Sequence, residues 1–228
     1  MNVPLILGFD TSVAHCAAAL RHGDNILLSR TEDMTRGQAE RLMPLLEDML
    51  TAEGLGWCDL DALGVGTGPG NFTGIRISVS AARGLALALG IPAVGISAFE
   101  LLAAEAEPAE HQLVSLPAPR GSVYVQLFTG GRASEPPRQI EPHKPPADLL
   151  LPSGCQVIGA QATQIANAFA GAALPATVAT ITTLPETLTR VAQDSLAAPG
   201  TLPQPPAPLY VRSADAAPPR DAPPVILP

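Results

Sequence analysis

The residues best suited to chemistry lie near the start of the chain. Asp10, Thr11 and Ser12 follow directly after the apolar run 5–9. A carboxylate and two hydroxyls at the end of a buried strand can hold a hydrated metal ion or a phosphate group. The same side chains can instead bond to the backbone of the next turn and fix its shape. These three residues alone leave both interpretations open.

A second candidate site is the glycine-rich segment 66–74, which reads GTGPGNFTG and precedes a helical pattern. A helix N-terminus presents unpaired N–H groups and the positive end of a dipole, which attract anions. The segment has neither the Lys-Ser/Thr ending of a Walker loop nor G-x-G-x-x-G spacing. It predicts either a phosphate site or a structural turn. The residues predicted to retain phosphate binding are Asp10, Thr11, Gly68, Gly70 and Thr73.

Other catalytic patterns are not visible in the sequence. The four histidines form neither H-x-x-x-H nor H-E-x-x-H, and no serine lies in a G-x-S-x-G elbow. Cys16, Cys58 and Cys155 are too few and too scattered for a disulfide framework or a zinc site, which favours a reducing compartment. We expect no catalytic residue, no metal site and no cofactor of the chain's own.

The composition narrows the class of protein. Of the 228 residues, 46% are hydrophobic and 15% charged, which is typical of a folded chain. The net charge of −8 argues against a free-standing nucleic-acid binder. The first residues lack the basic region of an export signal, and the uncharged apolar stretch 84–99, which glycine and proline interrupt, is shorter than the roughly 20 apolar residues of a membrane span. We expect a cytoplasmic protein that does not enter a membrane.

The order of predicted elements indicates an α/β fold. Only four of the 25 prolines fall within 1–107, so we expect a well-patterned N-terminal lobe there, a smaller, looser lobe over 108–212 and a proline-rich mobile tail over 213–228. The predicted strands are 5–10, 15–21, 26–32, 62–67, 92–97, 121–128 and 156–159. The predicted helices are 38–53, 73–89, 97–106, 161–169 and 184–196.

Two helices in the N-terminal lobe have an unusually wide usable surface. The apolar side chains of 38–53 cover an arc of about 160°, where one core needs somewhat more than about 100°. The helix 73–89 has a second face of small residues that lets another helix approach. We predict a partner on these faces; packing within the chain or exposure to solvent is the alternative. The predicted interface residues are Leu42, Met43, Leu46, Met49, Leu50, Arg76, Ser80, Arg83 and Gly84.

Several segments in register resemble one family. The segments 6–12, 37–44, 66–76 and 90–97 are similar to those of the bacterial TsaB (YeaZ) proteins, with weaker similarity at 121–124 and 209–212. The resemblance implies an actin/Hsp70/sugar-kinase-like fold of two lobes, each with a mixed five-stranded sheet and helices. It also implies a non-catalytic paralogue of TsaD, a family once described as glycoprotease-like.

The resemblance further implies partners and a pathway. TsaB proteins pair with TsaD, together with the ATPase TsaE, to attach a threonylcarbamoyl group to the adenosine beside the anticodon of tRNA. The activated donor comes from a separate synthase. The chain would meet tRNA only through this complex, and ATP or ADP would bind, if at all, at the partner interface. When alone, the chain could form a homodimer.

The sequence departs from its relatives in two places. TsaD has a metal-binding H-x-x-x-H on its first helix, where this chain has Gln38 and Leu42, neither of which replaces imidazole as a ligand. Many TsaB proteins have histidine at the position of Gln38, so a role of that side chain does not transfer. Pro117, Ala118, Pro119 and Arg120 stand in place of the family's D-A-R-R stretch.

Three functional hypotheses follow. The leading one is a scaffold that activates TsaD, for which Leu46→Glu or Gly84→Arg should abolish co-purification with TsaD and leave the melting temperature nearly unchanged. The second is an independent enzyme, either a peptidase or a small-molecule kinase that uses Asp10 and the glycine segment. The third is a homodimeric structural protein that uses the same helices on a second copy.

Overall fold

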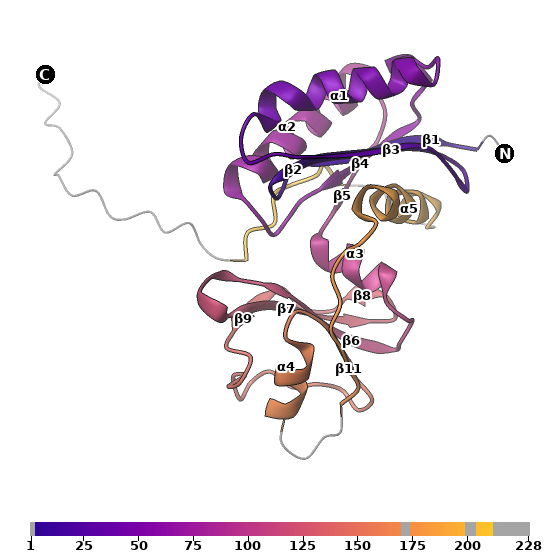
Figure 1. The fold of residues 1–228 in the computed structure, drawn as a ribbon. Coiled ribbons are helices and arrows are strands. Elements are labelled where there is room, and N and C mark those ends of the chain that lie inside the picture. Colours follow the sequence, from indigo (N-terminus) through magenta and orange to yellow (C-terminus); the bar gives the residue numbers. More distant parts are fainter. Residues whose placement is uncertain (1–2, 170–173, 199–203, 212–228) are drawn as a thin grey trace, which may run out of the picture.

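The computed structural model describes residues 3–169, 174–198 and 204–211, which form two lobes (Figure 1). Each lobe is built on its own mixed β-sheet with helices, which confirms the predicted α/β two-lobe fold. Arg212 and the predicted tail 213–228 lie outside the described residues.

The sheet of the N-terminal lobe has the five strands that the resemblance implies, and their order is β3-β2-β1-β4-β5. Their bounds are β1 Leu5–Asp10, β2 His15–His22, β3 Asn25–Asp33, β4 Ala62–Gly66 and β5 Ala93–Ile96. β2 and β3 are antiparallel and join through a two-residue turn in which Gly23 has a φ of 58°. β1, β4 and β5 are parallel, so their carboxyl ends meet at one edge of the sheet.

α1 (Gln38–Ala52) and α2 (Phe72–Leu89) cover one face of this sheet (Figure 1). α1 runs through Pro44, which therefore lies inside the helix rather than in its first turn. α2 is capped by Asn71 and ends at Gly90, which has a φ of 67°. In the described part of the chain α2 alone has the length and hydropathy of a membrane span, a test that core helices of soluble proteins also pass.

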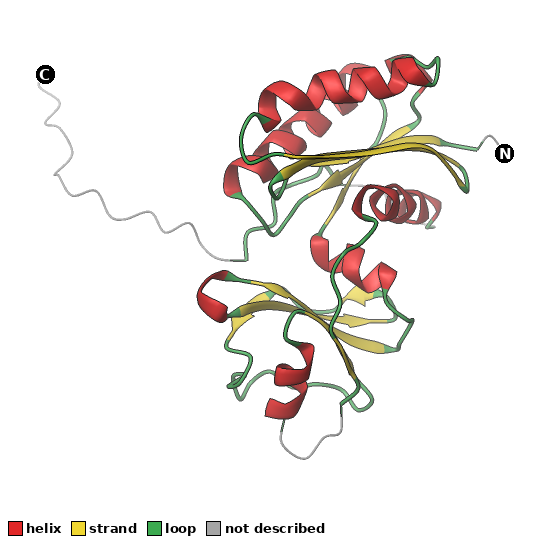
Figure 2. Ribbon diagram, in the orientation of Figure 1, coloured by secondary structure: helices red, strands yellow, loops and turns green. Residues whose placement is uncertain are grey.

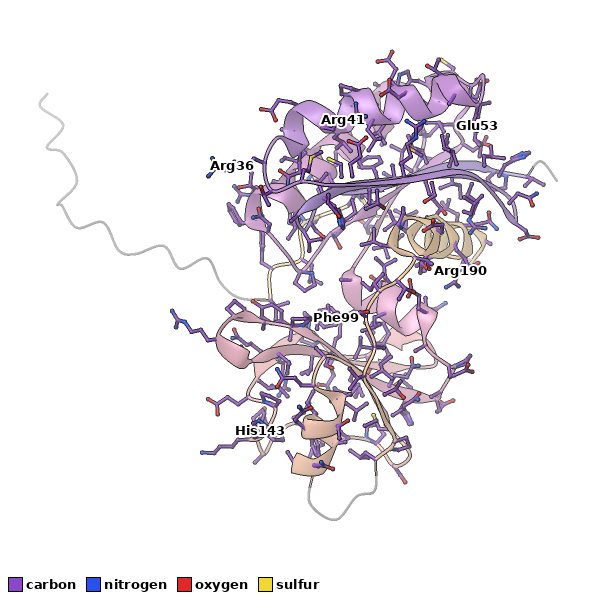
Figure 3. All side chains as sticks on the ribbon, viewed as in Figure 1. Arg36, Arg41, Glu53, Phe99, His143 and Arg190 are labelled. Carbon is purple, nitrogen blue, oxygen red and sulfur yellow. The ribbon has the colours of Figure 1, made fainter. Side chains whose placement is uncertain are left out.

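The opposite face of the sheet carries α3 (Ala98–Glu105) and α5 (Leu184–Ala197), so Figure 2 shows helices on both sides of the upper sheet. α3 begins at the capping box predicted for Ser97 and Glu100, in which each residue bonds the other's backbone N–H. It lies between the lobes: Leu101 packs with the first sheet, whereas Phe99 packs with the second (Figure 3).

α5 comes late in the sequence but packs on the N-terminal sheet. A Cβ on Gly8 of β1 would collide with Thr189, and one on Gly64 of β4 would press on Ala192, so these glycines allow close approach. Arg21 is buried beneath the helix, and its Nε donates to Thr189 Oγ1 at 3.1 Å. The predicted division at residue 107 is therefore wrong for this segment, because α5 belongs to the N-terminal lobe.

The sheet of the second lobe has six strands, one more than the resemblance implies. Four strands run in the order β11-β10-β6-β7, with β8 and β9 both paired to β7. The bounds are β6 His111–Pro117, β7 Val123–Thr129, β8 Arg132–Ala133, β9 Arg138–Ile140, β10 Gln156–Gly159 and β11 Ala176–Thr177. α4 (Ala162–Ala168) packs on this sheet, and short 3-10 turns occur at Trp57–Asp59 and Pro119–Gly121.

β6 is a central strand that the sequence pattern did not predict. Two polar residues, Gln112 and Ser115, interrupt its apolar run, yet both are buried. Gln112 Nε2 donates to Glu107 O at 3.0 Å, and Ser115 Oγ donates to Ala160 O at 2.7 Å. Since backbone carbonyls satisfy these side chains, the strand can be buried in spite of them.

Candidate functional site

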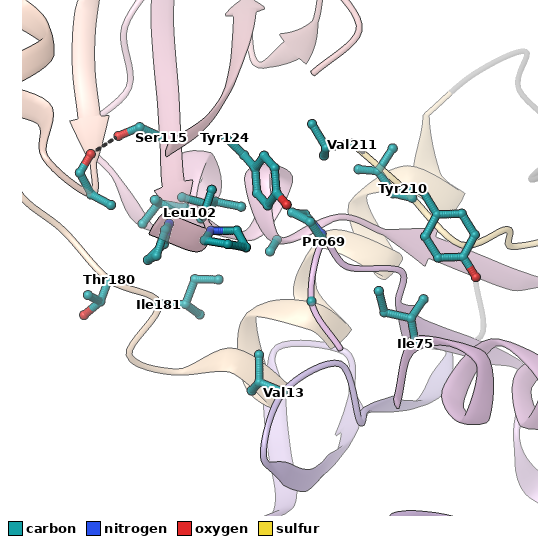
Figure 4. Close-up of a pocket in the computed structure, with 18 of the residues that line it drawn as sticks. Val13, Pro69, Ile75, Leu102, Ser115, Tyr124, Thr180, Ile181, Tyr210 and Val211 are labelled. Carbon is teal, nitrogen blue, oxygen red and sulfur yellow. Dashed lines mark hydrogen bonds between the residues drawn. The ribbon is translucent and has the colours of Figure 1, made fainter. Parts of the chain in front are cut away.

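A cleft of about 620 Å³ separates the lobes at the carboxyl ends of their parallel strands. In Figure 4, Val13, Ile75 and Tyr210 lie on the side of the N-terminal lobe, and Leu102, Ser115 and Tyr124 face them. The described lining residues are mostly apolar and none of them is charged. Open α/β sheets generally bind ligands at this edge, so the cleft is the natural candidate site.

Asp10 lies at this edge, and one oxygen of its carboxyl group is bonded within the chain. Its Oδ1 accepts from Ser12 N and Ser12 Oγ, both at 2.9 Å, and lies 2.8 Å from His15 Nε2. Its Oδ2 occupies the space that a Cβ on Gly66 would need. The Asp10 side chain is 2% exposed. Asp10 therefore fixes the turn 10–15, which is the structural alternative left open by the sequence.

The glycine segment packs against the same turn. Asn71 N donates to Ser12 O at 2.6 Å, and Thr11 Oγ1 donates to Gly74 O at 2.6 Å. A Cβ on Gly70 would collide with Ser12 O, and one on Gly74 would collide with Thr11 O. The glycines are thus required for close contact between two backbone segments, and we refer to the segments 10–15 and 66–74 together as the strand-end site.

Several of the predicted phosphate-binding groups already bond within the chain. Asn71 Oδ1 accepts from Thr73 N at 2.9 Å and from Gly74 N at 3.0 Å, so it takes the place of an anion at the start of α2. Gly68 O accepts from Ala98 N at 2.8 Å. Asp10, Thr11, Gly70 and Thr73 do come together as predicted, but Asp10 Oδ1, Thr11 Oγ1 and Thr73 N bond within the chain. The geometry does not support a phosphate site there.

The residues at the positions of TsaD's histidines have structural contacts. Gln38 Nε2 donates to Met34 O at 3.2 Å, and Leu42 lies in the core of the N-terminal lobe. Across the described residues, no three His, Cys, Asp or Glu side chains gather closely enough to hold a metal ion. The turn that replaces D-A-R-R places Pro117, Ala118 and Pro119 on the cleft, with Arg120 in the left-handed region at φ 60°.

The predicted partner interface divides into two groups. Leu42, Leu46, Met49 and Leu50 are buried in the N-terminal core, so their assignment to the interface is wrong. The apolar arc of α1 is wide because the helix packs against both the sheet and α2. The remaining residues lie at the surface and stay predictions: Met43, Arg76, Ser80, Arg83 and Gly84.

The sequence reasoning missed three exposed apolar residues on or beside α2. Leu87 is 87% exposed on the same side as Ser80 and Gly84, and we call the exposed residues Arg76, Ser80, Arg83, Gly84 and Leu87 the α2 face. Phe72 and Tyr210 are 46% and 43% exposed and stack with ring centroids 5.3 Å apart. Phe72 was visible as an aromatic residue inside a polar, glycine-rich segment, but nothing local in the sequence pairs it with Tyr210.

Comparisons with known proteins agree with this architecture. The family model "TsaD: tRNA N6-adenosine threonylcarbamoyltransferase" matches residues 25–133. The "tRNA threonylcarbamoyladenosine biosynthesis protein TsaB" of Escherichia coli (strain K12) is 36% identical over 122 residues, which are 52% of each chain. The solved structure of YeaZ from Pseudomonas aeruginosa has a TM-score of 0.67 at 27% identity and covers 85% of this chain and 92% of that one.

A second structure from Pseudomonas aeruginosa, described as an uncharacterized protein with similarity to peptidase YEAZ, has a TM-score of 0.69 at 25% identity. It covers 92% of this chain and 100% of its own. Two mixed sheets with flanking helices and a cleft at their strand ends define a two-lobe protein of the actin-like fold. By sequence over about half of its length, and by structure over most of it, the chain is similar to the TsaB (YeaZ) proteins. It spans about half the length of the curated relatives it matches.

Proposed function

We propose that this chain is a non-catalytic subunit that binds a TsaD-type protein and supports threonylcarbamoyl transfer to the adenosine beside the anticodon of tRNA. The observation that carries the proposal is a contrast within the N-terminal lobe. At the strand-end site Asp10 Oδ1, Thr11 Oγ1 and Asn71 Oδ1 bond within the chain, whereas the α2 face leaves apolar and cationic side chains exposed. Similarity to the TsaB (YeaZ) proteins supports a place in this tRNA modification pathway. The contrast between the strand-end site and the α2 face supports the scaffold role.

The geometry of Ser12 and His15 argues against a peptidase. A serine nucleophile needs a base that bonds to its hydroxyl. Here Ser12 Oγ donates to Asp10 Oδ1, and His15 Nε2 contacts that same oxygen. The hydroxyl is directed to the carboxylate instead of the imidazole, so Ser12 has no activating base.

The cleft also fits a nucleoside triphosphate poorly. Phosphates are generally bound by Lys or Arg side chains, by free N–H groups at a helix start or by a metal ion. The described lining has no charged side chain, and Asn71 uses the N–H groups of Thr73 and Gly74. ATP or ADP at the partner interface, which the resemblance implies, would therefore need its phosphate contacts from the partner.

The proposal assigns the remaining contacts to the complex. TsaD is the main partner and TsaE a further one, and tRNA reaches this chain only through them, because the net charge of −8 disfavours phosphate backbones. In this proposal the protein acts in the cytoplasm, where tRNA is modified. A homodimer that uses the same helices is the alternative state when TsaD is absent, and light scattering with and without TsaD distinguishes the two.

The test is a reconstituted modification reaction. Threonylcarbamoyl-adenosine in tRNA is measured with TsaD, TsaE and the donor synthase present, with and without this chain. We expect modification only when the chain is included, and no turnover by the chain alone. Equal modification without the chain would refute the scaffold role. Calorimetry of the isolated chain with ATP and magnesium should give a flat titration, and measurable binding would favour a kinase instead.

A further inference from the structure

An exposed aromatic cluster lies at the mouth of the cleft, next to the α2 face. Val13, Phe72 and Tyr210 all line the cleft, and each is between 43% and 47% exposed. Tyr210 belongs to the segment 204–211, whereas Phe72 is the first residue of α2. Exposed aromatic side chains packed beside an arginine have the composition of binding hot spots.

Arg76 is held in a fixed position by this cluster. Its Cζ lies 3.7 Å from the centroid of the Phe72 ring, and its Nε donates to Tyr210 Oη at 2.9 Å. No acceptor for Nη1 or Nη2 occurs among the described residues. The guanidinium is thus oriented before binding, with two donors that suit a planar carboxylate. A preorganised donor pair loses less conformational entropy when it binds.

The segment 204–211 that supplies Tyr210 is attached to both lobes. Leu209 N donates to Thr67 O at 2.9 Å, and Pro206 packs against Gly95 of β5. Leu209 and Val211 pack with Phe99 and with side chains of β6 and β7. The position of Tyr210, and through it that of Arg76, therefore depends on how this segment sits across the two lobes.

We infer that Phe72, Arg76 and Tyr210 form the anchor at which a carboxylate side chain of the TsaD-type partner binds. The inference rests on the proposed function and names one contact within it. The anchor is continuous with the α2 face, and its cation would attract an acidic group although the chain as a whole carries a charge of −8. The apolar neighbour Val13, and Leu87 about three turns further along the α2 face, favour a protein surface over the phosphates of RNA.

The test measures the dissociation constant of the full chain with its TsaD-type partner by calorimetry. Arg76→Ala should weaken binding about 30-fold, the range of a hot-spot residue, and Arg76→Lys about 10-fold because it loses the paired donors. Tyr210→Phe keeps the ring but removes the acceptor, and its effect should largely vanish in the Arg76→Ala background. Arg132→Ala, an exposed arginine on β8, is the matched control and should leave the constant unchanged.

Melting temperatures near that of the wild type confirm that the variants fold. Unchanged affinity of Arg76→Ala for the partner would overturn the anchor. If Gly84→Arg nevertheless blocks binding, the proposed scaffold function still holds, with a different contact residue. Additive effects of Arg76→Ala and Tyr210→Phe would also overturn it, because the two residues would then act separately. Loss of tRNA binding by the isolated Arg76→Ala chain, with partner affinity intact, would assign the cluster to RNA. Absence of partner binding by the wild type would reject the anchor and the proposed function together.

Discussion

The strand-end site and the α2 face lie in the same lobe but differ in how their polar and apolar groups are satisfied. At the strand-end site, Asp10 accepts from Ser12, Asn71 accepts from Thr73 N and Gly74 N, and glycines allow the backbones to touch. On the α2 face, Leu87 is exposed and Arg76 has donors without an acceptor in the described chain. The difference indicates that the first region maintains the fold, whereas the second has the unpaired groups that a partner can use.

The largest loss of stability is expected for substitutions on the side of α1 that faces the core. Leu46 is completely buried, and Leu46→Ala should lower the free energy of unfolding by about 3 kcal/mol because it leaves a cavity. Leu46→Glu should unfold the lobe, contrary to the expectation from the sequence that it would spare stability. Met43→Ala, one turn earlier and exposed, should cost less than about 1 kcal/mol. Urea unfolding measures both, and equal losses would contradict the assignment of inner and outer sides.

Alanine substitutions at one glycine of each region test the difference in packing between the strand-end site and the α2 face. Gly66→Ala should destabilise the protein by about 2 kcal/mol, since its Cβ must displace the Asp10 carboxylate. Gly84→Ala meets no neighbour and should stabilise α2 by roughly 0.5–1 kcal/mol. Thermal unfolding of the pair gives the sign of each effect. A neutral Gly66→Ala would mean that Asp10 is not tightly packed.

Glu105 should make stability depend on pH in the acid range. Burial raises the pKa of this carboxyl, but hydrogen bonds from Thr182, Thr187 and Thr183 outweigh burial and leave the pKa below its ordinary value of 4.5. A lowered pKa in the folded state stabilises the protein above pH 4.5, and this stabilisation is lost as the pH falls through the folded value.

The measurement is the difference in unfolding free energy between wild type and Glu105→Gln. The difference should be constant well above pH 4.5 and shrink below it. The exposed Glu110→Gln is the control and should give a small difference at every pH. If the difference between wild type and Glu105→Gln grows as the pH falls, the pKa of Glu105 is not lowered by folding and the explanation is wrong.

The smallest effect concerns cysteine labelling, which leaves the fold intact. Burial, reinforced by the Glu32 carboxylate, raises the pKa of the Cys16 thiol to about 11. Cys155 is also buried, whereas Cys58 is exposed. Because the thiolate is the reactive form, a maleimide should label Cys58 in the native protein and reach Cys16 and Cys155 only after unfolding. Mass spectrometry of labelled peptides shows the order in which the cysteines react. Labelling of Cys16 in the native protein would contradict this prediction.

The sequence predicted the N-terminal lobe well because its elements are local and periodic. α1, α2 and α5 begin and end within one residue of the predicted bounds, and the Ser97 capping box is confirmed. The packing of α5 on Gly8 and Gly64 was not predictable, since it joins residues far apart in the chain. β6 was missed because Gln112 and Ser115 hide its pattern.

The sequence predicted which residues form the candidate site, but not that they stabilise the fold instead of binding phosphate. The residues of the strand-end site were chosen correctly as neighbours, yet the sequence could not show that Asn71 and His15 would satisfy their bonds. Likewise, the wide apolar arc of α1 suggested a surface for another protein, but α2 of the same chain covers it. The contact of Tyr210 with Arg76 was not predicted because it spans 134 residues of sequence.

The most direct test of the scaffold account places one substitution in each region and measures tRNA threonylcarbamoylation in the reconstituted system. His15→Gln alters the strand-end site at the Asp10 contact, and Gly84→Arg adds a long side chain to the α2 face, where the structure leaves space for it. The account predicts that His15→Gln supports modification at a rate close to the wild type and that Gly84→Arg does not. Loss of modification with His15→Gln and full activity with Gly84→Arg would contradict it.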